Sequence, residues 1–302
     1  MKSTRFTIYF LPALALALLL GAISQLGLAQ DPLPAPTGNG EVIVIVDKTK
    51  HELHLARVQN GYEIFKTYPV TTGKNSGDKM VEGDLKTPEG IYQFSQRYNQ
   101  SQLKKKFGIM AFYIDYPNLI DKSEKKTGFD IMLHSTDDPA RLARPQDSDG
   151  CVVVNDERIK EIDPFIIPQK TMILIYDELK PAYLLPGTTE KVKTVFDTWL
   201  KAWSEKDLEA YIALYSKNFR GKNMNRDQYK IYKGFLNKKY DTIKVTASDI
   251  RYFTHPKYSM VTYHQQYLAT YKGGREAFNV SSRKRLYLIP EDGALKIFSE
   301  GN

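Results

Sequence analysis

The residues best suited to chemistry lie between Asp130 and Asn155. An apolar run ends at Leu133 and is followed at once by His134, and the chain's single cysteine, Cys151, comes later in the same segment. A thiol attacks only as its thiolate. An imidazole within hydrogen-bond reach can take the thiol proton and later return it to a leaving group. The pair therefore suits acyl transfer, with Cys151 as nucleophile and His134 as base.

Gly150 directly precedes the cysteine and lets the backbone approach a substrate closely. The amides of Gly150 and Cys151 can then point at a developing oxyanion, where the loss of one donor typically costs ~2.7–4 kcal/mol. Each residue taken alone also has a structural explanation. A His at a strand end usually makes a structural hydrogen bond, and a Gly-Cys pair that enters an apolar strand usually packs.

The N-terminal residues have the pattern of an export signal. A positive start, an apolar run over residues 6–20 and small residues at Gly27 and Ala29 predict a secretory signal peptide over residues 1–29. An uncleaved membrane anchor is the alternative, because the apolar stretch is nearly long enough to span a bilayer. In an oxidising compartment an unpaired Cys151 is either a reactive thiol or part of an intermolecular bridge.

Residues 30–40 are rich in Pro and Gly and predict a linker. Short β-branched runs separated by Gly- and Pro-rich turns then predict a mainly β domain over residues 41–178. A second linker is predicted at 179–189. The predicted strands of this domain include Glu41–Val46, Tyr62–Val70, Gly90–Phe94, Phe129–Leu133, Cys151–Val154 and Thr171–Tyr176.

The last third of the chain has a different pattern. Apolar residues at helical spacing follow Thr188 and Thr189, either of which can cap the predicted helix. Helices followed by long strands predict a smaller α+β domain over residues 190–302. The further elements predicted there are helices at 208–215 and 226–237 and strands at 243–252, 260–271, 281–289 and 295–298.

Charge separates the two predicted domains. The whole chain carries a net charge of +8, with −3 over residues 30–180 and +9 over residues 181–302. This asymmetry indicates two bodies with different surfaces and an anionic partner for the second. A cut near Leu185 is therefore expected to leave a folded first domain. We expect no metal ion, because no cluster of His or Cys has metal-ligand spacing. We also expect no other cofactor and no nucleic-acid partner.

The segment from His134 to Cys151 resembles the active-site signature of the L,D-transpeptidase catalytic domain of the YkuD type. That signature is a His, a gap of comparable length, then Ser or Thr, a variable residue, Gly and Cys. Two upstream elements, Pro69–Gly73 and Thr87–Tyr92, also fit, so that the resemblance covers roughly residues 41–177. It implies a β-sandwich-like fold with the thiol at the floor of a groove. It also implies a peptidoglycan tetrapeptide stem as substrate, attacked at the carbonyl of its third residue with release of D-Ala.

The resemblance also implies roles for single residues. Cys151 would be the nucleophile and His134 the base. The backbone carbonyl of Ser135 would orient the imidazole, and Gly150 would line the oxyanion hole. Many members of the family have Gly in place of Ser135.

The loop before the nucleophile supplies the expected substrate contacts. Ser148 and Asp149 precede the Gly-Cys pair, and many family members have His in place of Asp149. Many also have Arg in place of Val153. We therefore expect Arg141 and Arg144 to grip a substrate carboxylate, since a guanidinium fork matches its geometry.

The C-terminal elements look like the cone-shaped fold of nuclear transport factor 2. A YkuD-type domain followed by this module resembles the cell-shape L,D-carboxypeptidases of curved and helical bacteria, which trim tetrapeptides to tripeptides with water as acceptor. Three functions in the periplasm or cell wall stay open. They are acyl transfer to an amine, carboxypeptidase hydrolysis, and non-catalytic binding of an anionic wall polymer through the basic domain. The tyrosines at 252, 263, 267 and 271 either line a pocket or pack in a core.

Overall fold

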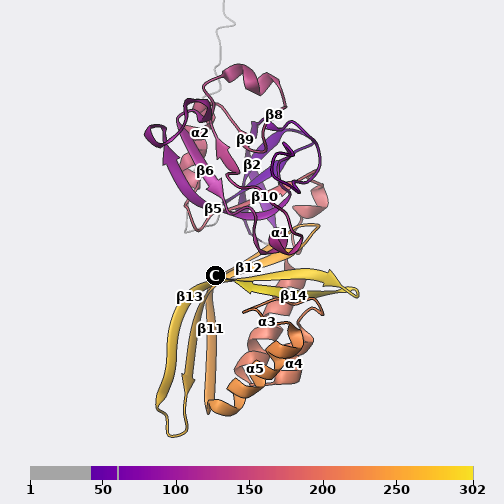
Figure 1. Cartoon of the computed structure of the whole chain (residues 1–302), viewed down its shortest axis with the longest axis vertical. Coiled ribbons are helices and arrows are strands. Elements are labelled where there is room, and N and C mark those ends of the chain that lie inside the picture. Colours follow the sequence, from indigo (N-terminus) through magenta and orange to yellow (C-terminus); the bar gives the residue numbers. More distant parts are fainter. Residues whose placement is uncertain (1–41, 60, 302) are drawn as a thin grey trace, which may run out of the picture. The chain divides into compact units, whose positions relative to one another are not determined.

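The computed structural model describes residues 42–59 and 61–301 (Figure 1). The predicted signal peptide and the predicted linker at 30–40 lie outside these residues. No helix in the described part combines the length and the hydrophobicity needed to cross a membrane.

The N-terminal region is built on a sheet that has eight strands among the described residues, in the order β3-β2-β1-β10-β5-β6-β7-β9. β1 (Val42–Asp47) is buried along its whole length, which explains its continuous β-branched run. It pairs in parallel with β10 (Met172–Tyr176) and antiparallel with β2 (Glu52–Val58). The other strands are β3 (Tyr62–Pro69), β5 (Gly90–Asn99), β6 (Met110–Ile114), β7 (Met132–His134) and β9 (Val152–Val153).

Smaller elements complete this region. β4 (Thr72–Gly73) and β8 (Gln146–Ser148) pair in parallel beside the main sheet. The helices are α1 (Leu119–Ser123) and α2 (Asp156–Ile162), and both begin at an Asn whose side chain accepts hydrogen bonds from the first-turn amides. The prediction of a mainly β domain is confirmed.

One predicted strand begins later than expected for a local reason. The run predicted at 129–133 forms β7 only from Met132, because Asp130 has a φ of +57° and interrupts the extended backbone. β7 then continues through His134. Cys151 likewise stands just before β9 rather than within it.

The C-terminal region has three helices and a four-stranded antiparallel sheet among its described residues. α3 (Glu190–Ser204) begins after Thr189, at the predicted position, but the Thr189 side chain makes no capping hydrogen bond. α4 (Leu208–Ala213) and α5 (Arg226–Lys239) follow it. The helices pack on one face of the sheet, around the buried Trp199 (Figure 1). The sheet runs β11 (Thr242–Thr254), β12 (Ser259–Thr270), β13 (Glu276–Glu291) and β14 (Ala294–Gly301) in sequence order. The α+β prediction is confirmed.

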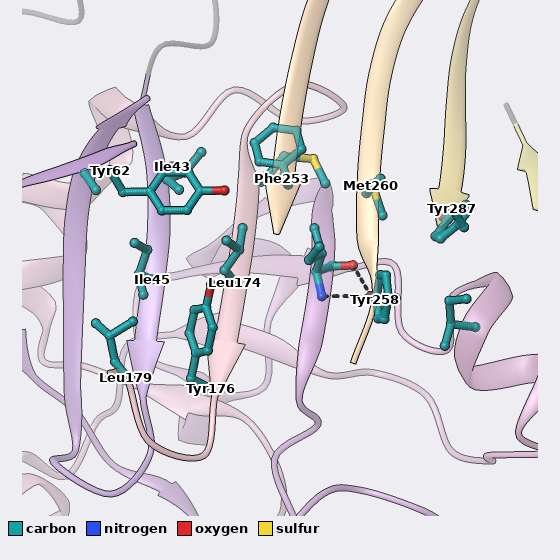
Figure 2. Close-up of a cluster of buried hydrophobic side chains, with 14 of the residues drawn as sticks. Ile43, Ile45, Tyr62, Leu174, Tyr176, Leu179, Phe253, Tyr258, Met260 and Tyr287 are labelled. Carbon is teal, nitrogen blue, oxygen red and sulfur yellow. Dashed lines mark hydrogen bonds between the residues drawn. The ribbon is translucent and has the colours of Figure 1, made fainter. Parts of the chain in front are cut away.

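An apolar cluster joins the two regions. Ile43 and Leu174 from the first sheet pack in one buried cluster with Phe253, Met260 and Tyr287 from the second (Figure 2). The described residues of both regions accordingly form a single compact unit. A cut near Leu185 would expose the first domain's side of this cluster to water, and folding of that domain alone stays a prediction.

Candidate active site

Strands β7 and β9 bring the predicted nucleophile and base into one groove. They pair in parallel, with Leu133 opposite Val152 and His134 opposite Val153. Cys151 and His134 both line a groove of about 730 Å³. His134 is buried, whereas Cys151 is partly exposed. The groove also takes residues from the segments 74–85, 102–107 and 128–132.

His134 is held in one orientation. Its Nδ1 lies 2.5 Å from the carbonyl oxygen of Ser135, the contact that the family resemblance implied. This contact makes Nδ1–H the donor and leaves the Nε2 lone pair available to accept a proton. Phe107 meets the ring edge to face at 5.0 Å. Burial lowers the pKa of His134 to about 4, although the Ser135 carbonyl acts in the opposite direction, so the imidazole is neutral at pH 7.

Cys151 rests as a thiol. Burial raises its pKa to about 11, and the backbone amide of Met132 offsets only part of that effect. Its Sγ contacts the carbonyl oxygen of Asp130 at 3.7 Å, and it makes no hydrogen bond to His134 in the described part of the chain. Attack therefore requires the thiol to turn toward His134 and to lose its proton as the new bond forms.

The turn before the nucleophile is fixed by Ser148 and Gly150. The Ser148 hydroxyl donates to the carbonyl of Cys151 at 2.6 Å and accepts from the Gly150 amide at 3.1 Å. Gly150 has a φ of +127°, and a Cβ there would lie 2.8 Å from the carbonyl oxygen of Lys86. The Gly150 amide is therefore already engaged within the turn, which does not fit its predicted part in an oxyanion hole.

Of the four predicted substrate contacts in the 141–149 loop, Arg141, Ser148 and Asp149 line the groove, and Arg144 does not line it in the described part of the chain. Asp149 lines the groove and its carboxylate pairs with Lys74 at 2.9 Å. Arg141 lines the groove, is 18% exposed and donates to the backbone oxygen of Asp147 at 2.9 Å. Arg144 is 54% exposed, pairs with Asp147 and is not among the groove-lining residues in the described part of the chain. Of the two predicted arginines, Arg141 is the one that lines the groove.

Ser135 replaces a common glycine without disturbing the base. It is fully buried, and its Oγ accepts from the amide of Ile109 at 2.8 Å. Gly108 makes room for this hydroxyl, since a Cβ at Gly108 would lie 2.2 Å from it. Gly108 thus provides the space for Ser135, which stands where many family members have Gly.

Several groove residues were not predicted from the sequence. Lys106 and Phe107 close one wall, while Tyr113 and Asp130 stand near the thiol. The only sequence feature that could have indicated these groove residues is the run of lysines at 104–106, and a solvated loop would have the same run. Among the described residues, no group of His, Cys, Asp or Glu side chains could hold a metal ion.

The C-terminal region has a cavity of its own, of about 670 Å³. Lys233 is buried there, with its Nζ 3.7 Å from the centroid of the Trp203 ring. Burial lowers the pKa of Lys233 to about 8, and the carboxylate of Glu300 acts against this shift. Tyr263 and Tyr267 line the cavity, and both also pack in core clusters, with Tyr263 fully buried.

Comparisons with known proteins fit this two-part geometry. Residues 41–175 match the L,D-transpeptidase catalytic domain model, YkuD, and residues 191–301 match the Cds6 C-terminal NTF2-like domain model. The chain carries an L,D-transpeptidase catalytic domain followed by an NTF2-like domain. The groove described above lies in the catalytic domain, and the Lys233 cavity lies in the NTF2-like domain.

Solved structures resemble both domains together. The structure of Bd1075 from Bdellovibrio bacteriovorus matches with a TM-score of 0.72 and 28% identity, over 87% of this chain and 92% of that one. The helical cell shape determining protein Pgp2 from Campylobacter jejuni matches with a TM-score of 0.68 and 24% identity, over 86% of this chain and 91% of that one. A search among curated protein sequences returned no match.

Proposed function

We propose that the protein cleaves peptidoglycan stem peptides through a thioester on Cys151. The observation that carries the proposal is the pairing, on one groove of an L,D-transpeptidase catalytic domain, of a partly exposed thiol with a neutral imidazole whose Nε2 is available. L,D-transpeptidase domains act on the cell wall, which supports a site of action outside the cytoplasm.

The first half of the proposed reaction forms the acyl-enzyme. The Sγ of Cys151 attacks the carbonyl carbon of the third stem residue while His134 Nε2 takes the thiol proton. The amide of Cys151 stabilises the oxyanion of the tetrahedral intermediate. The C–N bond to D-Ala then breaks, and the imidazolium returns the proton to the leaving amine.

The second half of the reaction defines the enzyme class. An amine acceptor gives a cross-link between third residues, which is transpeptidation. A water acceptor gives a tripeptide, which is carboxypeptidase activity. One observation favours the carboxypeptidase. The chain shares its two-domain architecture with Pgp2, a helical cell shape determining protein, and the cell-shape enzymes that the sequence resembles use water as the acceptor.

A digest of purified tetrapeptide muropeptides tests the proposal. Tripeptide monomer as the sole product identifies the carboxypeptidase, and new dimers without tripeptide identify the transferase. The Cys151→Ala variant is the matched control and should give neither product. A wild-type protein that leaves tetrapeptide intact would favour the non-catalytic wall-binding alternative.

The NTF2-like domain is proposed to hold the enzyme on an anionic wall polymer. Its support is the charge of +9 over residues 181–302. Attraction of this kind weakens as salt screens the charges. Binding of the full chain to isolated sacculi should therefore fall between low and physiological ionic strength, and salt-independent binding would contradict the electrostatic account.

A further inference from the structure

The turn between β11 and β12 of the NTF2-like domain enters the catalytic domain. Tyr258 in this turn is buried, and its hydroxyl accepts from the Ile91 amide at 2.8 Å and donates to the Ile91 carbonyl at 2.8 Å (Figure 2). The side-chain amide of Asn118 donates to the same hydroxyl at 2.7 Å. These contacts fix the turn against the start of β5, and they leave the neighbouring Lys257 at the base of the groove wall.

That wall is the segment 77–89. Lys79, Glu82 and Leu85 from this segment line the groove that holds Cys151. The carbonyl of Lys86 lies against Gly150, the residue that precedes the nucleophile. A shift of the segment therefore changes both the width of the groove and the backbone that presents the thiol.

Lys257 connects the two ends of this segment. Its Nζ lies 2.6 Å from Asp78 Oδ2 and 3.1 Å from Glu89 Oε2. Asp78 Oδ1 also accepts the backbone amide of Glu89 at 2.8 Å, which closes the loop at its base. Two catalytic-domain lysines complete the network, since Lys126 lies 2.6 Å from Asp78 and Lys48 lies 2.7 Å from Glu89.

The network is charged and poorly hydrated. Asp78 and Glu89 are 15% and 12% exposed at their side chains, and Lys257 is 29% exposed. Burial acts to raise the pKa of both carboxyls, yet the surrounding ammonium groups hold both values below their usual range. Removal of Lys257 leaves Asp78 with Lys126 and Glu89 with Lys48, but the cation that joins the two carboxylates is lost. In a partly buried network this loss costs more than the loss of an exposed ion pair.

We infer that Lys257 of the NTF2-like domain is a positioning residue for the catalytic groove, which it shapes by bridging Asp78 and Glu89 at the two ends of segment 77–89. The inference deepens the proposed function and rests on it only for its kinetic part. It makes the NTF2-like domain necessary for a well-formed groove, in addition to any binding that the domain performs. Sequence patterns of the catalytic domain alone carry no sign of it.

Arg285 provides a matched control. It also reaches from the NTF2-like domain to the catalytic domain, where it binds the carboxylate of Asp115 and the side chain of Gln93. None of these three residues lines the groove in the described part of the chain. An Arg285→Gln variant thus removes an interdomain ionic contact without touching segment 77–89.

The first experiment follows hydrogen exchange in the full chain and needs no substrate. Lys257→Gln should make the amides of residues 78–88 exchange at least about tenfold faster. Lys257→Arg, which keeps a cation between the two carboxylates, should restore protection, and Arg285→Gln should leave the segment unchanged. The inference is overturned if Lys257→Gln leaves the exchange of this segment as in the wild type, or if Arg285→Gln loosens it equally.

The second experiment measures turnover of tetrapeptide muropeptide. Lys257→Gln should lower kcat/KM by about 10- to 100-fold, the range expected for a misplaced groove, with rescue by Lys257→Arg and no change in Arg285→Gln. A wild-type protein without turnover would contradict the proposed function and leave the exchange result standing. Equal turnover by wild type and Lys257→Gln would overturn the inference alone.

Discussion

The groove that holds Cys151 and the cavity that holds Lys233 have similar volumes, about 730 and 670 Å³, yet they are suited to different tasks. Burial acts in the same direction at both places and favours the uncharged forms of the thiol, the imidazole and the amine. Only the groove sets a nucleophile beside a base with an available lone pair. The comparison teaches that perturbed ionisation marks both sites, whereas the pairing of groups marks the catalytic one.

The largest expected difference between the two sites comes from removing their central groups. Cys151→Ala should lower turnover of tetrapeptide muropeptide by at least about 10³-fold, because no other group can form the thioester. Lys233→Met should leave turnover of the same soluble substrate within about twofold, since the lysine lies in the other domain. A steady-state assay of both variants checks this, and comparable losses would show that the cavity takes part in the chemistry.

A steric change beside the thiol should have the next largest effect. Gly150→Ala places a Cβ 2.8 Å from the Lys86 carbonyl oxygen, so the turn that presents Cys151 must shift. We expect kcat/KM to fall by about 100-fold. Gly83→Ala is the matched control: Gly83 also has a positive φ and lies on the groove, but an added Cβ meets no atom within 4 Å. Equal losses would mean that backbone strain alone accounts for the effect.

Acid should destabilise the folded chain through two buried imidazoles. The pKa of His134 and that of His255 are both lowered to about 4, mainly by burial, from an ordinary value of 6.5. The unfolded chain therefore binds more protons below pH 6.5, and stability should be lost as the pH falls from about 6.5 to about 4, by about 1–3 kcal/mol for each residue. Urea unfolding of the wild type and of His255→Asn at pH 7 and pH 5 checks this. The variant should lose less on acidification, and an equal loss would contradict the shift at His255.

The smallest effect distinguishes the two loop arginines. Arg141→Ala should raise KM by about tenfold, the value of a lost charge-assisted hydrogen bond to a substrate carboxylate. Arg144→Ala should change KM by less than about twofold, because its side chain is exposed and pairs with Asp147. Initial rates over a range of muropeptide concentrations separate the two variants. A larger effect at Arg144 would place the substrate on the outer side of the loop.

The sequence predicted the architecture well because hydrophobic periodicity reports which face of an element is buried. It also predicted the segment that carries His134 and Cys151, since both flank short apolar strands. It did not predict that β7 would begin only at Met132, because the positive φ of Asp130 has no signal in the residue types. The sequence also did not predict contacts between distant segments. Lys257 resembles any turn lysine until the fold sets it between Asp78 and Glu89.

The sequence did not predict the contact between the two domains, for a related reason. Linker composition at 179–189 and opposite net charges describe only the surfaces of the two domains. They carried no information about the buried faces, where Leu174 and Met260 meet in one cluster. Apolar residues that pack across a domain boundary have the same pattern as those that pack within a domain.

Trapping the acyl-enzyme tests the central claim most directly. The full chain is incubated at pH 7 with a carbapenem, a strained acylating agent, and its mass is measured intact and after proteolysis. We expect a single adduct on Cys151 in the wild type, formation slowed by about 10²- to 10⁴-fold in His134→Ala, and none in Cys151→Ala. A wild-type protein that gains no adduct, or gains it equally fast without His134, would contradict the assignment of this thiol and imidazole as nucleophile and base.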